Sequence, residues 1–172
     1  MSSKLLVLIG LVGLISCTKE NKYSNIPEIN LGGYERLMTS DNKDSLLLIT
    51  LNFTDGDGDL GYEEADTIPP YSIGEPYFYN LHVDFYGVGN SGKQYFIDNF
   101  SGDTIRFSQR LESITPEGKF KSISGSFEIR IDYSLLLING YTPDKVQLEF
   151  WINDRALNAS NKVLSPEIEL NL

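Results

Sequence analysis

A cluster of acidic residues is the strongest chemical signal in this sequence. Six carboxylates fall within one short segment, namely Asp55, Asp57, Asp59, Glu63, Glu64 and Asp66. The first three alternate with single glycines, which let the chain curl so that the carboxylates point at one centre. Carboxylates this close repel one another unless a cation lies between them, and calcium takes six to eight oxygen ligands. The segment therefore predicts a calcium site formed by these six residues. An acidic turn that holds only water is the alternative.

The charge distribution supports a cation or a basic partner at this segment. The 172-residue chain has a net charge of −10, and the window 44–92, which contains no Lys or Arg, carries −9 of it. This acidity argues against nucleic-acid binding, which needs clustered Lys and Arg. The alternating aspartates match the start of an EF-hand loop. However, Leu60 stands where that loop needs glycine and Asp66 where it needs glutamate. We therefore expect a calcium loop between two strands.

A segment rich in proline and tyrosine follows the acidic one. Residues 68–79 read IPPYSIGEPYFY. Exposed tyrosines can stack on a sugar or contact a protein, so Tyr71, Tyr77 and Tyr79 are ligand-binding candidates. The alternative is that these aromatic side chains pack the loop onto the rest of the domain.

The sequence offers little for catalysis. His82 is the only histidine and precedes Asp84 by two residues, but no Gly-x-Ser-x-Gly segment supplies a nucleophile. We predict that the protein is not an enzyme and has no catalytic residue. A small carboxylate-dependent hydrolase is the alternative, because two carboxylates can hydrolyse a glycosidic bond. Asp154 is expected to pair with the adjacent Arg155, or else to join the calcium ligands.

The elements that position these residues are predicted to be strands, because apolar and polar side chains alternate along the chain with a period of two. The alternation is clear in four segments, at 47–53, 77–85, 123–131 and 146–152. Weaker strand candidates are 28–31, 94–97, 105–111 and 163–170, and one helical turn is expected within 132–138. Seven or eight short strands predict an all-β fold, an immunoglobulin-like antiparallel β-sandwich.

The N-terminal segment is typical of an exported protein. Lys4 precedes an apolar run that is too short to span a membrane, as in a secretory signal peptide. The residues Leu14-Ile15-Ser16-Cys17 resemble a bacterial lipobox, and Cys17 is the only cysteine. These features predict a lipoprotein signal peptide over 1–16, a tether lipidated at Cys17 over 17–26, and one domain over 27–172.

Two internal segments extend this resemblance. LNFTDGDGDLG at 51–61 and VQLEFWINDRALNASN at 146–161 are similar to signatures of small Bacteroidetes-type lipoproteins with an immunoglobulin-like domain, although Leu157 stands where a glycine is usual. The resemblance implies an outer-membrane lipoprotein at the cell surface, and no activity is established for the family. We expect a binding or scaffolding module with a protein or glycan ligand and no nucleic acid. A glycan-binding accessory protein of a surface uptake system is the alternative.

Overall fold

The computed structural model describes residues 23–115 and 121–172, so the predicted signal peptide and Cys17 lie outside the described residues. The described residues form eight strands and one short helix: β1 Glu28–Met38, β2 Asp44–Asp55, β3 Leu81–Gly89, β4 Gly92–Tyr95, β5 Ile123–Asp132, α1 Ser134–Ile138, β6 Lys145–Ile152, β7 Val163–Leu164 and β8 Ile168–Glu169. In this described part of the chain, no helix is long and apolar enough to cross a membrane.

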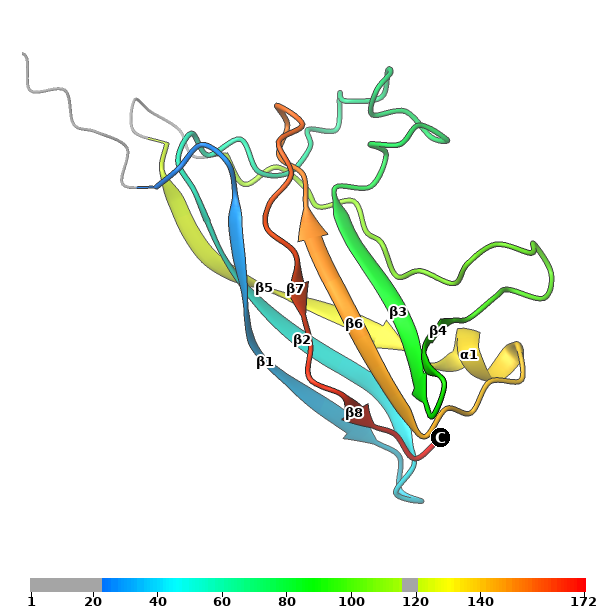
Figure 1. Ribbon diagram of the computed structural model, residues 1–172. Helices are drawn as coiled ribbons and strands as arrows, with labels where there is room; N and C mark the ends of the chain where they lie inside the picture. Colours follow the sequence, from blue (N-terminus) through cyan, green and yellow to red (C-terminus); the bar gives the residue numbers. More distant parts are fainter. Residues whose placement is uncertain (1–22, 116–120) are drawn as a thin grey trace, which may run out of the picture.

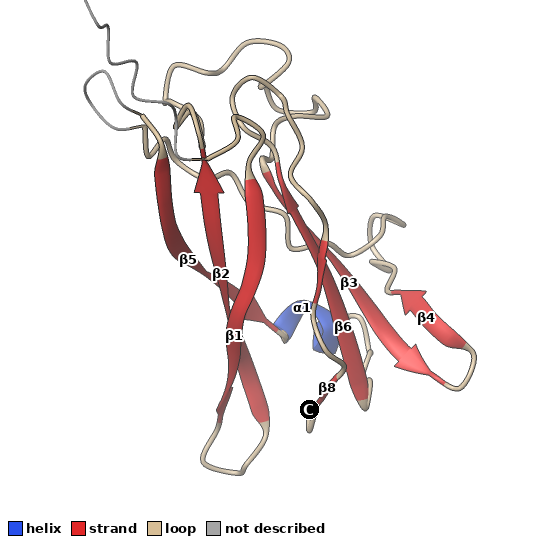
Figure 2. Ribbon diagram, turned by 60° about the vertical axis from the view of Figure 1, so that its left-hand side comes forward, coloured by secondary structure: helices blue, strands red, loops and turns tan. Residues whose placement is uncertain are grey.

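The strands form two antiparallel sheets that face each other (Figures 1 and 2). One sheet has the order β1-β2-β5, and the other has the order β4-β3-β6-β7, with β8 also paired to β6. These orders correspond to strands A-B-E and C′-C-F-G of an immunoglobulin-like sandwich. The predicted all-β sandwich is therefore confirmed.

The core lies between the sheets and follows from the alternation of side chains along each strand. Leu47, Ile49 and Leu51 of β2 are fully buried, while the residues between them are half-buried. Strand β6 contributes Val146, Leu148, Phe150 and Ile152 from the opposite sheet. Burial of a large aliphatic or aromatic side chain stabilises the fold by about 1.5–3 kcal/mol, so the period of two decides which face of each sheet points inward.

Three predicted strands differ in extent from the structure. The strand expected from Tyr77 begins only at Leu81, because residues 68–80 form a series of turns, such as the one closed by the hydrogen bond from Phe78 N to Glu75 O. Residues 105–111 make single bridges to β3 at Arg106 and Gln109 instead of a continuous strand. Residues 163–170 form two short strands, β7 and β8, interrupted around Pro166.

The loops that carry the candidate residues gather at one end of the sandwich. The loop after β2 and the turn after β6 both lie there, whereas the turn between β1 and β2 and the C-terminus lie at the other end (Figure 1). Residues near 55 and near 154 are therefore brought together although about 100 positions separate them in sequence.

Candidate metal centre

Asp55, Asp57 and Asp59 form one cluster at the end of β2. One carboxylate oxygen from each lies within 4.8 Å of the others. The pleat of β2 turns Asp55 toward the interior, in step with Phe53, and the Asp55 residue is fully buried. The loop then curls back so that Asp57 and Asp59 face Asp55. The structure thus brings together the three aspartates whose spacing predicted a common centre.

Four of the six carboxylate oxygens in this cluster are buried and lack a hydrogen-bond donor among the described residues. Both oxygens of Asp55 are buried without a partner, as are Oδ1 of Asp57 and Oδ1 of Asp59. Buried polar atoms in proteins are nearly always hydrogen-bonded. An unpaired buried carboxylate is more costly still, since ionised groups lose strong hydration. The cluster therefore demands protons or a cation.

Burial and crowding raise the pKa values of Asp55 and Asp59. Burial, followed by repulsion from Asp57 and Asp59, raises the pKa of Asp55 from 3.8 to about 7. Burial and repulsion from Asp154 and Asp57 raise the pKa of Asp59 to about 6. A cation among these oxygens would lower the pKa values of Asp55 and Asp59, because it favours the ionised carboxylates.

Two glycines allow the loop to adopt this shape. Gly58 has a φ of 64°, a left-handed conformation that costs other residues about 1–2 kcal/mol. Gly56 allows a close approach of the chain: its N–H donates to Ser24 O, and an added Cβ would lie 2.4 Å from Tyr23 O. Tyr23 and Ser24, near the end of the predicted tether, are therefore fixed against the acidic loop.

Asp154, which follows β6, is a fourth carboxylate near this cluster, although it is not among the three whose oxygens lie within 4.8 Å of one another. It is fully buried, and burial and Asp57 are among the causes that raise its pKa. Its Oδ1 accepts from Asn158 N at 2.7 Å and its Oδ2 from Asn158 Nδ2 at 2.8 Å. These bonds hold a turn in which Leu157 has a φ of 69°. Leu157 thus adopts the left-handed geometry for which glycine is the usual residue.

The turn after β6 is also bonded directly to the acidic loop. Ala156 N donates to Oδ2 of Asp59 at 3.0 Å, and Arg155 N donates to Asp59 O at 3.1 Å. Each oxygen of Asp59 and Asp154 has two lone pairs. The oxygens that already accept one hydrogen bond can therefore still face a cation.

The other three predicted ligands lie apart from this cluster. Asp66 accepts from Nη2 of Arg155 at 2.8 Å, and Glu63 lies 3.9 Å from Nη1 of the same guanidinium. Glu64 is exposed and lines a separate surface pocket with Glu63. The expected pairing of Asp154 with Arg155 is wrong, since Arg155 instead binds Asp66 and Asp154 binds Asn158.

The donor set of the cluster fits calcium. Two ligands of one calcium ion at 2.3–2.6 Å lie up to about 5 Å apart, which agrees with the 4.8 Å within which the three carboxylate oxygens lie. Arginines within the described residues pair with Asp44, Asp84 and Asp66. No ion pair among those residues reaches Asp55, Asp57, Asp59 or Asp154, so a cation would have no internal competitor there.

The three candidate tyrosines have different environments. Tyr71 packs against Tyr62 with 4.8 Å between ring centroids, and its hydroxyl donates to Arg155 O. Tyr77 is half-buried, whereas Tyr79 is 44 % exposed. Tyr71 therefore helps to pack the loop, and Tyr79 is the most accessible of the three.

Arg110 supports the proline- and tyrosine-rich loop, and the sequence pattern did not single it out. Its guanidinium donates to the carbonyls of Asp66, Tyr71 and Phe78, and its Cζ lies 4.7 Å from the ring centroid of Tyr62. Arg110 lies in a weakly predicted strand, and nothing in the neighbouring sequence indicates that its side chain would bind loop carbonyls.

His82 has no nucleophile within hydrogen-bond distance. Its Nε2 lies 3.0 Å from Oδ1 of Asn153, and its ring stacks on Trp151. Asp84 is engaged by Arg106 at 2.9 Å. Burial lowers the pKa of His82, which favours the neutral ring.

The fold and the acidic cluster place the chain in a broad class: an all-β sandwich with a candidate calcium loop at one end. No family model, curated protein sequence or solved structure matches the chain.

Proposed function

We propose that this chain is a lipid-anchored cell-envelope protein that holds calcium in its acidic loop and serves as a binding or scaffolding module at the cell surface. The ion is supported by the cluster itself: one carboxylate oxygen each of Asp55, Asp57 and Asp59 lies within 4.8 Å of the others, and each residue has a buried oxygen without a hydrogen-bond partner. Calcium at about ten times its dissociation constant would stabilise the domain by about 1.4 kcal/mol. This is a sizeable part of the stability of a small domain.

The lipobox-like residues Leu14-Ile15-Ser16-Cys17 support the anchor, together with the use of the single cysteine at that position. Tyr23 follows Cys17 by six residues, and an extended chain covers about 3.5 Å per residue. A lipid on Cys17 would therefore lie within about 20 Å of Tyr23. Since Gly56 N is bonded to Ser24 O, the calcium loop would occupy the membrane-proximal end of the domain.

The contacts around the carboxylates and His82 favour binding over catalysis. A hydrolase needs a base within reach of a nucleophile or a substrate-facing carboxylate pair. His82 instead faces Asn153, and within the cluster Asp55 is fully buried while Asp57 and Asp59 are half-buried. We therefore propose a non-catalytic role, and we propose no nucleic-acid partner because the chain is strongly acidic.

Calorimetric titration of chelator-stripped protein tests the ion. Calcium should bind with one-to-one stoichiometry, and magnesium should bind much more weakly, because magnesium requires near-ideal octahedral geometry. Asp57→Asn should weaken calcium binding at least tenfold, while Asp41→Asn, an exposed aspartate in the turn between β1 and β2, should not. Equal binding by all three proteins would exclude this site.

Detergent phase partitioning of the protein expressed in a lipoprotein-processing bacterium tests the anchor. The wild type should enter the detergent phase, and Cys17→Ala should remain in the aqueous phase. A Cys17→Ala protein that still partitions into detergent with bound lipid would rule out anchoring through this residue.

A further inference from the structure

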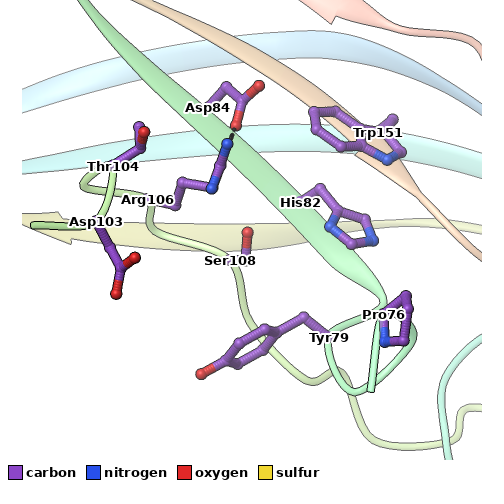
Figure 3. A pocket seen from close by; sticks show the side chains of 9 residues that line it. All are labelled: Pro76, Tyr79, His82, Asp84, Asp103, Thr104, Arg106, Ser108 and Trp151. Atoms are coloured by element: carbon purple, nitrogen blue, oxygen red, sulfur yellow. Dashed lines mark hydrogen bonds and ion pairs between the residues drawn. The ribbon is translucent and has the colours of Figure 1, made fainter. Parts of the chain in front are cut away.

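The outer face of the β4-β3-β6-β7 sheet carries a pocket that none of the six acidic-loop carboxylates lines. It has a volume of about 670 Å³ and is lined by nine residues: Pro76, Tyr79, His82, Asp84, Asp103, Thr104, Arg106, Ser108 and Trp151 (Figure 3). Strand pairing produces this grouping, because His82 lies opposite Trp151 and Asp84 lies opposite Arg106. The volume is within the range of about 300–1,000 Å³ typical of small-molecule sites.

Flat side chains form one wall of the pocket. The rings of His82 and Trp151 are 4.7 Å apart and inclined by only 8°. Nζ of Lys162, the residue just before β7, lies 4.3 Å from the Trp151 ring centroid. The His82 ring is held by the hydrogen bond between its Nε2 and Oδ1 of Asn153. Trp151 is thus enclosed, and the ring of His82 stands beside Ser108, Tyr79 and Pro76 (Figure 3).

Polar groups held in fixed positions form the other wall. Asp84 has only 9 % of its side chain exposed and accepts from Arg106 Nε at 2.9 Å and from the hydroxyl of Tyr95 at 3.4 Å. This pairing leaves both terminal nitrogens of Arg106 without a hydrogen bond to any described residue, and 52 % of the Arg106 side chain is exposed. Asp103 is exposed nearby and makes no ion pair within the described residues.

The charges of the pocket decide between ligand classes. Asp84 and Arg106 neutralise each other, and Asp103 leaves a single negative charge, which disfavours phosphates and acidic peptides. A lipid chain is a poor ligand, because it cannot form hydrogen bonds with the donors and acceptors that line the pocket. A sugar ring fits both walls, since its C–H face can lie against an aromatic ring whose face is electron-rich and its hydroxyls both donate and accept hydrogen bonds.

We propose that this pocket binds a neutral saccharide, with a sugar ring against His82 and Tyr79 and its hydroxyls bonded to Arg106 and Asp103. This names the ligand class of the binding module and rests on that proposed role, but it requires neither calcium nor the lipid anchor. Of the three tyrosines that the sequence suggested as ligand contacts, only Tyr79 lines this pocket. The other proposed contacts come from β3 and from the segment that contains Asp103 and Arg106.

Trp151 provides a direct readout because it is the only tryptophan in the chain and lines the pocket. The purified full-length protein should be titrated with neutral oligosaccharides of glucose, mannose, galactose, xylose and N-acetylglucosamine. Tryptophan fluorescence and calorimetry should be recorded in parallel. At least one oligosaccharide should give saturable binding by calorimetry. Arg106→Ala should weaken it at least tenfold and Asp103→Asn about threefold, because each loses a bond to a hydroxyl.

Arg130→Ala is the matched control, because Arg130 is an exposed arginine on β5 in the other sheet. It should change the affinity by less than twofold. Titrations that stay blank for every neutral oligosaccharide, binding confined to acidic glycans or peptides, or equal binding by Arg106→Ala would each overturn the inference. Melting curves of the same samples with and without calcium separate the two proposals. Protein that responds to calcium but binds no saccharide refutes only the pocket, and the reverse refutes only the ion site.

Discussion

Replacing Asp55 by asparagine should have opposite effects in the presence and absence of calcium. Without the ion, the buried carboxylate is repelled by Asp57, Asp59 and Asp154, and these neighbours and burial raise its pKa from 3.8 to about 7. One pKa unit corresponds to 1.36 kcal/mol, so ionised Asp55 costs the cation-free fold up to about 4 kcal/mol. We expect Asp55→Asn to recover about half of this cost, because the asparagine amide would also be buried where the Asp55 oxygens find no hydrogen-bond partner.

The sign follows from proton binding. The folded state holds a proton on Asp55 at pH values where the unfolded chain has released it, so the cation-free wild type loses stability as the pH rises from about 4 to about 7. Asp55→Asn should remove most of that slope. Calcium should reverse the ranking, because the wild type gains about 2.7 kcal/mol at one hundred times the dissociation constant and the variant loses a ligand.

Thermal unfolding followed by circular dichroism measures both effects. A change of 1 kcal/mol shifts Tm by about 2–4 °C in a domain of this size. At pH 8 with chelator, Asp55→Asn should therefore melt about 4–8 °C above the wild type, and with saturating calcium it should melt below it. Asp41→Asn, which changes an exposed aspartate, should shift neither curve. The reasoning fails if Asp55→Asn is destabilised in chelator or if calcium raises the Tm of both proteins equally.

Three further substitutions test contacts around the centre. Gly56→Ala adds a Cβ 2.4 Å from Tyr23 O, so its Tm in calcium should fall by several degrees, whereas Gly89→Ala, with no atom within 4 Å of the added Cβ, should change little. Asn158→Ala removes the side-chain hydrogen bond from Nδ2 to Oδ2 of the buried Asp154 and keeps the backbone one, and urea unfolding should show a loss of about 1–3 kcal/mol. Arg110→Ala removes donors to three loop carbonyls and should speed limited proteolysis within residues 66–79.

Each of these three predictions can fail separately. Equal melting temperatures for the two glycine variants would show that the tether and the loop are not in close contact. An Asn158→Ala protein with unchanged stability would mean that the turn after β6 is held by other bonds. Unchanged cleavage of Arg110→Ala would indicate that the loop is fixed by its aromatic contacts alone.

The sequence predicted the fold class because burial along a strand is a local property. Leu47, Ile49 and Leu51 alternate with residues that face outward, and no distant residue is needed to identify their buried face. The same local logic predicted the short helix after β5. It failed at Tyr77 and Tyr79, where alternating aromatics match a strand but Pro76 and the neighbouring turns delay β3 until Leu81.

The carboxylate cluster was predicted in part for a similar reason. The spacing of Asp55, Asp57 and Asp59, with glycines between them, is enough to bring three carboxylates to one centre. Spacing could not show that Arg155 would draw Asp66 and Glu63 away from that centre. It also could not decide that Asp154, about 100 positions further along the chain, would be buried near that centre.

The sequence by itself thus determined the all-β sandwich and the three aspartates of the loop, and it supplied the pattern on which the lipid anchor is proposed. Only the tertiary structure placed Asp154 near the three aspartates and formed the pocket lined by His82, Arg106 and Trp151. The physical reason is that a local period specifies which way a side chain points. The register of paired strands, set by packing across the whole sheet, specifies which distant side chain it meets.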